Sequence, residues 1–471
     1  MNYSSFEDTI AAPATIPGTG AVTIVRISGP EAVAIAGKIV KCKTRSLEAS
    51  DGYSVRYGLV CREDGSIVDE VLATVFRAPH SYTGEDSVEI SCHASSYVAS
   101  EILRLLCDSG ARMAEAGEFT RRAFVNGKMD LAQAEAVADV ISSSSSASLR
   151  VAMNQLRGGY SSELKDIRER LLELASLLEL ELDFSEEDVE FADREKLSLL
   201  LDEVIGHVSS LAYSFRQGNA IRNGVPVAIV GAVNAGKSTL LNTLLGDDRA
   251  IVSDIPGTTR DTVEETMTLD GILFRFIDTA GLRSATDEIE RIGVSRSLKK
   301  LSEASIVLAV LDSTASEEEN EAIISDIVSK IDFESQKLFV LLNKVDILAP
   351  NINVKLLNKS VSSSGSKVVK LYISAKEGFG LDSLKKELVS TQKDLSSDFD
   401  NTIVTNLRHY EALRKAVSAL ENVRSSMALG LTPDLLAEDL RDALRHLGSI
   451  TGEVTPDEVL GQIFGRFCIG K

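Results

Sequence analysis

The sequence predicts a multidomain fold: an N-terminal α/β domain, an all-α helical domain and, inserted into the helical domain, a P-loop domain with a parallel sheet flanked by helices. Three observations support this prediction. A glycine-rich loop, GAVNAGKS at 231–238, lies between an apolar run at 225–230 and a helical pattern. Further apolar runs at 306–311 and 338–342 are typical of buried parallel strands. Helical periodicity occurs on both sides, at 119–217 and at 393–471.

Composition limits the class of protein. The chain has 471 residues, enough for about three domains. A net charge of −20 argues against a broad basic surface for nucleic acid, although a local patch is compatible with it. The five cysteines include no C-x-x-C pair, and we find no signal peptide and no apolar stretch of membrane-spanning length. We therefore expect a cytoplasmic protein with reduced thiols and no membrane contact.

The N-terminal region, 1–118, alternates strand patterns with turns. We expect strands at 21–27, 52–61 and 67–76, the last two joined as a hairpin, and a helix at 96–108. Arg26 lies within an apolar strand, and Glu89 ends another. Because a buried charge needs a partner, each of them forms a structural ion pair or faces a ligand. His93 lacks the further ligands of a metal site, so we expect it to be structural.

Helical patterning dominates the regions before and after the P-loop domain. We expect helices at 161–182 and 193–217, a helical serine run at 142–146, and a linker at 218–224. Further helices are expected at 407–429 and 433–447, with Thr432 as N-cap before Pro433. The apolar faces of the two regions need partners, so we expect them to pack together around an inserted domain at 218–392.

The loop at 231–238 has the residues of a phosphate cradle. Gly231 and Gly236 allow the tight turns that direct backbone N–H groups at an anion. Lys237 supplies a positive charge for the β- and γ-phosphates, and Ser238 offers a hydroxyl to Mg²⁺. The following helix directs its positive end at the same place. An ordinary glycine turn is the alternative, and the motifs that follow argue against it.

Two segments after this loop could respond to the γ-phosphate. Thr259, within IVSDIPGTTRD at 251–261, is the candidate second hydroxyl for Mg²⁺. After a predicted strand at 269–277, Asp278 could hold Mg²⁺ through water, and the Gly281 N–H could contact the γ-phosphate. Loss of such contacts on hydrolysis is how nucleotide switches work.

Two later motifs identify guanine as the base. In Asn343-Lys344-Val345-Asp346, the Asp346 carboxylate can accept from the N1–H and the exocyclic amine of guanine, and adenine offers no such pair. In Ser374-Ala375-Lys376, which follows a predicted strand at 368–373, the Ala375 N–H can reach the guanine O6.

The position after the 278–281 motif departs from Ras-like proteins, which have a water-positioning glutamine there. Here the residue is Leu282, so hydrolysis needs another group, and Asp287, Glu288 and Glu290 are the nearby acidic candidates. A monovalent cation could replace an arginine finger, because positive charge stabilises the transition state.

These motifs resemble the MnmE (TrmE) family of tRNA-modification GTPases over essentially the full chain. The matching segments are TGED at 83–86, RRAFVNGKMDLAQAEAVADVI at 121–141, GAVNAGKS, DIPGTTRD, DTAGLR at 278–283, NKVD and the terminal FCIGK. The resemblance implies a folate-binding and dimerisation domain at 1–118, a helical domain formed by 119–217 and 393–471, and a Ras-like GTPase domain at 218–392.

The resemblance also implies functional residues. GTP would be contacted by Asn234, Ala235, Gly236, Lys237, Ser238, Thr239, Ser253, Asp254, Ile255, Pro256, Gly257, Thr258, Thr259, Asp278, Thr279, Ala280, Gly281, Asn343, Lys344, Asp346, Ser374, Ala375 and Lys376. A K⁺ ion would be held by Asn234, Ser253, Ile255 and Thr258, although family members usually have Thr at the position of Ser253. Glu290 would orient the hydrolytic water, and Cys468 would assist catalysis or be structural.

By the same resemblance, Arg26, Glu89, Lys128 and Lys471 would line a pocket for 5-formyltetrahydrofolate or a related tetrahydrofolate. The family has a Gly-Gly pair where Ala94-Ser95 stand here. The implied assembly is a homodimer that joins an FAD-dependent MnmG-type partner in a heterotetramer and modifies C5 of the wobble uridine of certain tRNAs. The alternative is a regulatory or ribosome-assembly GTPase switch. For RNA contact, Arg121, Arg122, Arg441 and Arg445 are a candidate patch, with a solvated helix face as the alternative.

Overall fold

The computed structural model describes residues 6–183, 194–232, 234–246, 265–277, 301, 303–333, 335–347, 368–392, 402–454, 457–465, 467 and 470. The chain divides into two compact units. The first unit contains 1–138, 155–204 and 415–471, and the second contains 139–154 and 205–414. Within the described ranges, no helix is both long and apolar enough to cross a bilayer.

The first unit begins with a seven-stranded sheet in the order β3-β4-β5-β6-β2-β1-β7. Val25 and Ile27 of β2 are fully buried on the face covered by α1 and α2, whereas Arg26 lies on the other face, opposite Glu89 of β6. The predicted hairpin is confirmed, because β4 and β5 pair antiparallel. The elements are β1 Ile10–Pro13, β2 Val22–Ser28, α1 Ala32–Ile39, β3 Val40–Cys42, β4 Ser54–Cys61, β5 Ile67–Phe76, β6 Ser87–His93, α2 Ser96–Asp108 and β7 Arg112–Met113.

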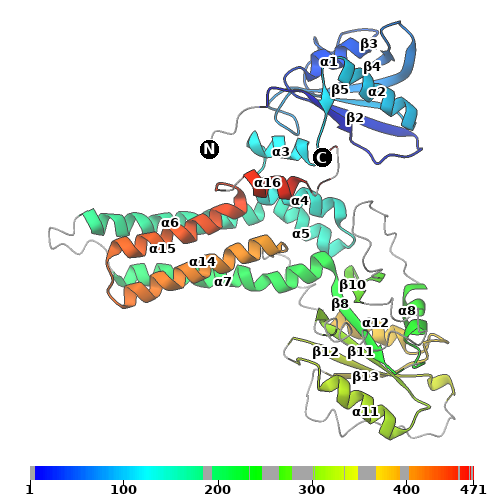
Figure 1. Cartoon of the computed structure of the whole chain (residues 1–471), viewed down its shortest axis with the longest axis vertical. Coiled ribbons are helices and arrows are strands. Elements are labelled where there is room, and N and C mark those ends of the chain that lie inside the picture. Colours follow the sequence, from blue (N-terminus) through cyan, green and yellow to red (C-terminus); the bar gives the residue numbers. More distant parts are fainter. Residues whose placement is uncertain are drawn as a thin grey trace. The chain divides into compact units, whose positions relative to one another are not determined.

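Helices from distant parts of the sequence complete the first unit. Figure 1 shows α6 and α15 side by side, and the Arg168 guanidinium of α6 donates to the Leu444 carbonyl of α15 at 2.9 Å. The predicted pairing of helices from before and after the P-loop domain is therefore confirmed. These elements are α3 Glu118–Val125, α4 Leu131–Ser142, α6 Gly159–Asp183, α14 Leu407–Ala428, α15 Pro433–Thr451 and α16 Asp457–Phe464; α4 and α14 also contribute to the second unit.

The second unit contains a six-stranded sheet in the order β13-β12-β11-β8-β10-β9. All pairings are parallel except that of β9 with β10. The predicted strands β11 and β12 are buried along almost their whole length, as expected for a sheet covered on both faces. The elements are α5 Ser146–Leu156, α7 Arg194–Asn223, β8 Val225–Gly231, α8 Lys237–Gly246, β9 Glu265–Leu269, β10 Ile272–Ile277, β11 Ile306–Asp312, α11 Glu317–Val328, β12 Lys337–Asn343, η2 Val345–Ile347, β13 Val368–Tyr372 and α12 Leu381–Ser390, with α5 and α7 extending into the first unit.

Helix α5 contributes to the core of the second unit. Its Ala147 and Val151 are buried in one apolar cluster with Val225 at the start of β8, Phe274 of β10, and Ile403. The core beneath the second sheet is therefore completed by a segment that precedes the P-loop domain by many residues and by another that follows it.

Three local predictions are wrong. The serine run is not helical throughout: α4 ends at Ser142, and the Ser145 hydroxyl accepts from the Ser148 N–H at 3.1 Å as α5 begins. Serine side chains compete with the helix for backbone N–H groups, which makes them better caps than helix interiors. The predicted linker at 218–224 is mostly helix, since α7 continues to Asn223, and Gly224, with φ +82°, follows it.

The third error concerns the strand predicted at 269–277. The structure has a hairpin here, β9 to β10, with the turn at Asp270 and Gly271. Both turn residues have positive φ, 46° and 81°, as type I′ turns require. An Asp-Gly pair between apolar residues is the usual sequence of such a turn, so the sequence contains the signal for this hairpin.

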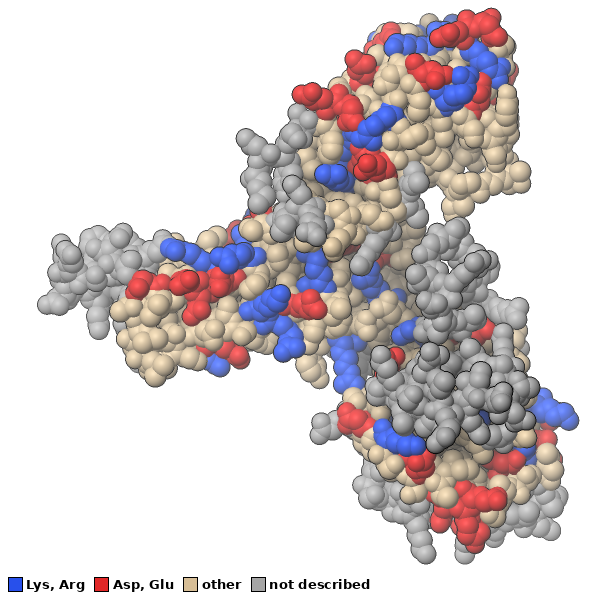
Figure 2. All heavy atoms as spheres, in the orientation of Figure 1, with Lys and Arg blue, Asp and Glu red and all other residues tan. Residues whose placement is uncertain are grey.

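Charge on the described surface is mixed. Figure 2 shows Lys and Arg side chains interspersed with Asp and Glu over the described residues of the visible face. Exposed arginines commonly have acidic neighbours, as in Arg445 with Asp442 at 2.7 Å and Arg170 with Glu203 at 3.4 Å. This arrangement agrees with the strongly acidic composition.

Candidate functional site

The glycine-rich loop joins β8 to α8 at the centre of the second sheet. A Cβ on Gly231 would lie 2.1 Å from the Val310 carbonyl oxygen of β11, and one on Gly236 would lie 2.2 Å from the Asn343 side-chain nitrogen. Both have positive φ, 147° and 96°. These positions therefore require glycine for space as well as for backbone conformation.

The Lys237 ammonium group lies inside the curve of the loop. Its Nζ donates to the carbonyl oxygens of Gly231 at 2.9 Å and Ala232 at 2.6 Å. Burial lowers the pKa of Lys237 from its ordinary value. Lys237 is also the first residue of α8, so its charge and the positive end of the helix lie at one place. This combination suits a polyanionic ligand such as a nucleotide phosphate chain.

Asn343, at the end of β12, connects the phosphate loop with the 374–376 loop. Its side-chain Nδ2 donates to the Ala235 carbonyl at 2.8 Å, and its Oδ1 accepts from the Ala375 N–H at 2.9 Å. Asn343 is buried, with 3% of its surface exposed. Three predicted segments are thus held together by one amide side chain.

The predicted base-binding residues follow the same strands. The Ser374 hydroxyl donates to Asp346 Oδ1 at 2.6 Å, and the Thr243 hydroxyl of α8 donates to the Ala375 carbonyl at 2.8 Å. Lys376 is largely exposed beside Glu377. An oriented carboxylate at Asp346 next to the Ala375 loop is what recognition of the guanine edge requires.

A further polar residue, Asp312, lies at this edge of the sheet and is not among the residues predicted from sequence. It ends β11 beside Asn343, and its Oδ2 lies 2.6 Å from Lys344 Nζ. An acidic residue at the carboxyl end of a buried apolar strand was the available signal, because ligands bind at that edge of parallel sheets.

Other predicted site residues lie outside the described part of the chain. These are Ser253, Asp254, Ile255, Pro256, Gly257, Thr258, Thr259, Asp278, Thr279, Ala280, Gly281, Glu290, Cys468 and Lys471. Asn234 is described and has a left-handed backbone, with φ +63°, and Ser238 and Thr239 lie in the first turn of α8.

In the first unit, the structure brings Arg26 and Glu89 together. Arg26 Nη2 lies 2.8 Å from Glu89 Oε1, and the guanidinium is 5.4 Å from the centre of the Tyr82 ring and 5.6 Å from that of Phe119. The Arg26 and Glu89 side chains are 16% and 25% exposed, so the two residues form an ion pair and remain accessible to solvent. The Lys128 ammonium donates elsewhere, to the Pro79 carbonyl at 3.0 Å.

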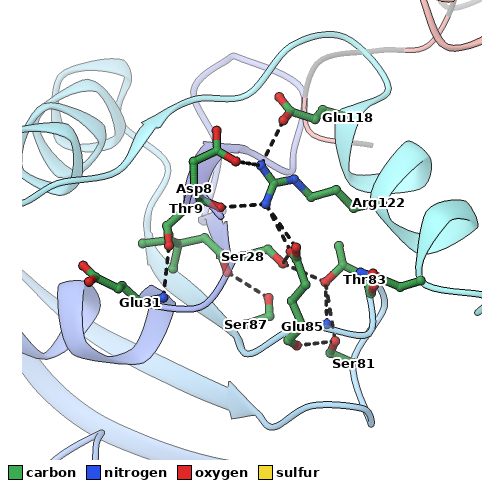
Figure 3. Close-up of polar contacts among 12 residues, drawn as sticks. Asp8, Thr9, Ser28, Glu31, Ser81, Thr83, Glu85, Ser87, Glu118 and Arg122 are labelled. Atoms are coloured by element: carbon green, nitrogen blue, oxygen red, sulfur yellow. Dashed lines mark hydrogen bonds and ion pairs between the residues drawn. The ribbon is translucent and has the colours of Figure 1, made fainter. Parts of the chain in front are cut away.

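The prediction of an RNA-contacting or solvated Arg122 is wrong. Arg122 is completely buried and pairs with Asp8 at 2.7 Å, Glu85 at 3.1 Å and Glu118 at 3.1 Å, as Figure 3 shows. Asp8 and Glu118 also pair with Arg112. Burial raises the pKa of Asp8 and Glu118, but the hydrogen bonds and charges of the two arginines outweigh it and hold both pKa values below normal.

A mainly parallel sheet with a Lys-containing phosphate loop after its central strand β8, and an Asn-Lys-x-Asp loop after β12 of the same sheet, define a P-loop GTPase. The MnmE helical domain family matches residues 131–468, and the family described as GTP-binding protein TrmE N-terminus matches residues 9–128. The chain belongs to the MnmE (TrmE) family of tRNA modification GTPases.

Full-length relatives agree with this assignment. The chain is 48% identical to the tRNA modification GTPase MnmE of Bacteroides fragilis strain YCH46 over 467 residues, which cover 99% of this chain and 100% of that protein. It is 47% identical to the MnmE of Porphyromonas gingivalis, covering 100% of this chain and 99% of that protein. The MnmE of Flavobacterium johnsoniae is also 47% identical, with 99% coverage of both chains.

Proposed function

We propose that this chain is a K⁺-stimulated GTP hydrolase that drives addition of a carboxymethylaminomethyl-type group to C5 of the wobble uridine of certain tRNAs. It acts as a homodimer with an FAD-dependent MnmG-type partner, in a cytoplasmic heterotetramer, and a tetrahydrofolate supplies the one-carbon unit. The observation that carries the proposal is the 48% identity over 99% of the chain to a protein named as a tRNA modification GTPase.

GTP binding is assigned to the edge of the second sheet. Lys237 contacts the β- and γ-phosphates, exchanging its loop carbonyl partners for phosphate oxygens. Asp346 accepts from the guanine edge, and Asn343 keeps the phosphate and base loops in register. Because all these groups are positioned by strand ends, little rearrangement is needed for the base to bind.

Two ions belong to the proposal. Of the residues that would hold them, Ser238 and Asn234 are described, and their hydroxyl and amide oxygens are of the type that such cations bind. Mg²⁺ would be held by Ser238 and Thr259, and K⁺ by Asn234 together with Ser253, Ile255 and Thr258. Asn234, with φ +63°, lies in the glycine-rich loop three residues before Lys237, and a neutral amide oxygen is a suitable ligand for a monovalent cation. When bound, the ions supply positive charge that stabilises the transferring phosphoryl group.

Glu290 is assigned the role of orienting the attacking water, because Leu282 has no hydrogen-bonding group. Arg26 and Glu89 of the domain at 1–118 are assigned to the folate pocket together with Lys128 and Lys471, which lie outside that range. The inserted GTPase domain at 218–392 drives the modification reaction. The part-exposed Arg26–Glu89 pair, with Tyr82 and Phe119 around the guanidinium, suits a flat, partly charged ligand. Cys468 is assigned an assisting role.

The ion requirement is tested by GTP turnover of the full chain in KCl and in NaCl at equal ionic strength. We expect faster GTP turnover in K⁺ than in Na⁺. The role of Glu290 is tested in the same assay, where Glu290→Ala should lose most of the activity and Glu288→Ala should not. Loss of one such positioning group commonly lowers the rate by about 10²–10³-fold. Equal turnover in the two salts would refute the cation assignment.

The tRNA role is tested by nucleoside analysis of tRNA from cells that lack the protein. We expect unmodified uridine at the wobble position, restored by the wild-type gene and not by Arg26→Ala. An unchanged nucleoside profile together with impaired ribosome assembly would favour a GTPase switch instead. The GTPase assignment would survive that outcome, because it depends on the second unit alone.

A further inference from the structure

Asp312 and Lys344 form an ion pair at the rim of the base-binding loop. Lys344 Nζ lies 2.6 Å from Asp312 Oδ2, and the side chains are 30% and 20% exposed. Lys344 has a left-handed backbone, with φ +67°. A non-glycine residue rarely adopts this conformation without local interactions to stabilise it, and the ion pair is one such interaction.

Asp312 is itself held in place. Its Oδ1 accepts from the Thr314 N–H at 2.9 Å and from the Thr314 hydroxyl at 2.6 Å. Its carbonyl oxygen accepts from the Asn320 side chain at 2.9 Å, and Asn320 is 1% exposed. One carboxylate oxygen therefore fixes the orientation of the group, and the other is directed at Lys344. Burial raises the pKa of Asp312, but its hydrogen bonds to Lys344 and Thr314 outweigh this effect and lower it, so the carboxylate is charged at neutral pH.

The neighbouring residues of the same loop are held by other elements. Asn343 bonds to the phosphate loop and to Ala375, and Asp346 bonds to Ser374. Lys344 is the remaining long side chain of the motif, and the ion pair connects it to β11. A lysine stem offers an apolar surface on which a flat base can pack while its ammonium group stays satisfied.

Resting on the base-binding role proposed above for the 343–346 loop, we propose that Asp312 is a positioning residue of the GTPase site: it holds the Lys344 side chain in its base-binding conformation and thereby sets the affinity for guanine, without affecting the phosphates. Without Asp312, Lys344 must lose its rotamer freedom when the nucleotide binds. Immobilising one such side chain typically weakens binding by about two- to tenfold.

The test is the Kd for GDP of the full chain carrying Asp312→Asn. We expect a rise of about two- to tenfold, while the affinity for inorganic triphosphate, measured by competition, stays unchanged. The matched control is Asp326→Asn, which removes an ion pair of the same 2.6 Å length between Asp326 of α11 and Lys330, and should leave both affinities unchanged. An unchanged Kd for GDP, or equal losses for GDP and triphosphate, would overturn the proposal.

A double-mutant cycle shows whether Asp312 acts through Lys344. In a Lys344→Met chain, Asp312→Asn should produce no further loss of GDP affinity, whereas a general structural role would weaken binding again. If Asp312→Asn does not fold, Thr314→Ala serves instead, since it keeps the charge but loosens the carboxylate. We expect a smaller rise in the Kd for GDP there, and no rise would contradict the proposal.

Discussion

Replacing Arg122 with leucine should destabilise the N-terminal sheet strongly. Arg122 is fully buried and neutralises Asp8, Glu85 and Glu118, whose side chains are 44%, 12% and 4% exposed. Removing one member of a buried ion pair commonly costs about 3–5 kcal/mol, because the remaining charge is left uncompensated. Arg112 still pairs with Glu118, so we expect the lower end, about 3 kcal/mol.

Amide hydrogen exchange is the appropriate assay, because a chain with two units does not unfold in a single step. The amides of β2 report on this sheet alone. A loss of about 3 kcal/mol corresponds to exchange faster by about 10²-fold. The control is Arg445→Leu, since Arg445 is 61% exposed and pairs only with Asp442 among the contacts described, so its effect should be below about 1 kcal/mol.

The effect of Arg122→Leu should also depend on pH. The folded-state pKa values of Asp8 and Glu118 lie below their ordinary values of 3.8 and 4.5. Their stabilising contribution is therefore present above those ordinary values and is lost as the pH falls through the folded-state values. The difference in stability of the N-terminal sheet between the wild type and Arg122→Leu should be constant near pH 7 and should shrink below about pH 4. Equal exchange rates in the two chains at pH 7 would refute the reasoning.

Two glycine substitutions test the geometry of the second unit. Gly236→Ala should weaken GDP binding by about tenfold to a hundredfold, because the strained φ of +96° and a contact of 2.2 Å with Asn343 must both be relieved; binding at the wild-type level would contradict this. Gly271→Ala should speed exchange in β9 and β10, since its Cβ would lie 2.3 Å from the Ser146 hydroxyl, and Ser146→Ala should remove part of that effect. The control is Gly65→Ala, because Gly65 has a similar φ of +82° but no neighbour within 4 Å, so this substitution measures the backbone strain alone in its own hairpin. Equal destabilisation by Gly271→Ala and Gly65→Ala would show that the Ser146 contact is unimportant.

The second sheet could be predicted largely from sequence, because its information is local. Buried parallel strands are continuous apolar runs, and each motif residue lies directly after its strand, so chain order nearly determines position. Asn343 and Asp346 follow this rule. Asp312 follows it as well, but belongs to no familiar motif and was overlooked for that reason.

The role of Arg122 could not be predicted in the same way. Helical spacing places it on a face of α3 with Glu118 one turn earlier, but its other carboxylate partners, Asp8 and Glu85, come from distant segments of the chain. Only the folded sheet brings these segments together, so local pattern cannot distinguish a buried arginine from a solvated one. The prediction of a helix through the serine run at 142–146 was wrong for a different reason. The Ser145 side chain caps the start of α5, and such capping competes with continuation of the preceding helix over a few residues.

The shared core around α5 has a consequence for how the protein is made. Ala147 and Val151 leave the ribosome well before the strands on which they pack, and Ile403 leaves it after all of them. The nascent helix must therefore keep its apolar face without these native neighbours until β8 and β10 have been translated. A recombinant fragment cut at 218–392 would lack both flanking contributions and therefore part of the core of the second unit, so a fragment meant to fold alone must also carry α5 and the segment around Ile403.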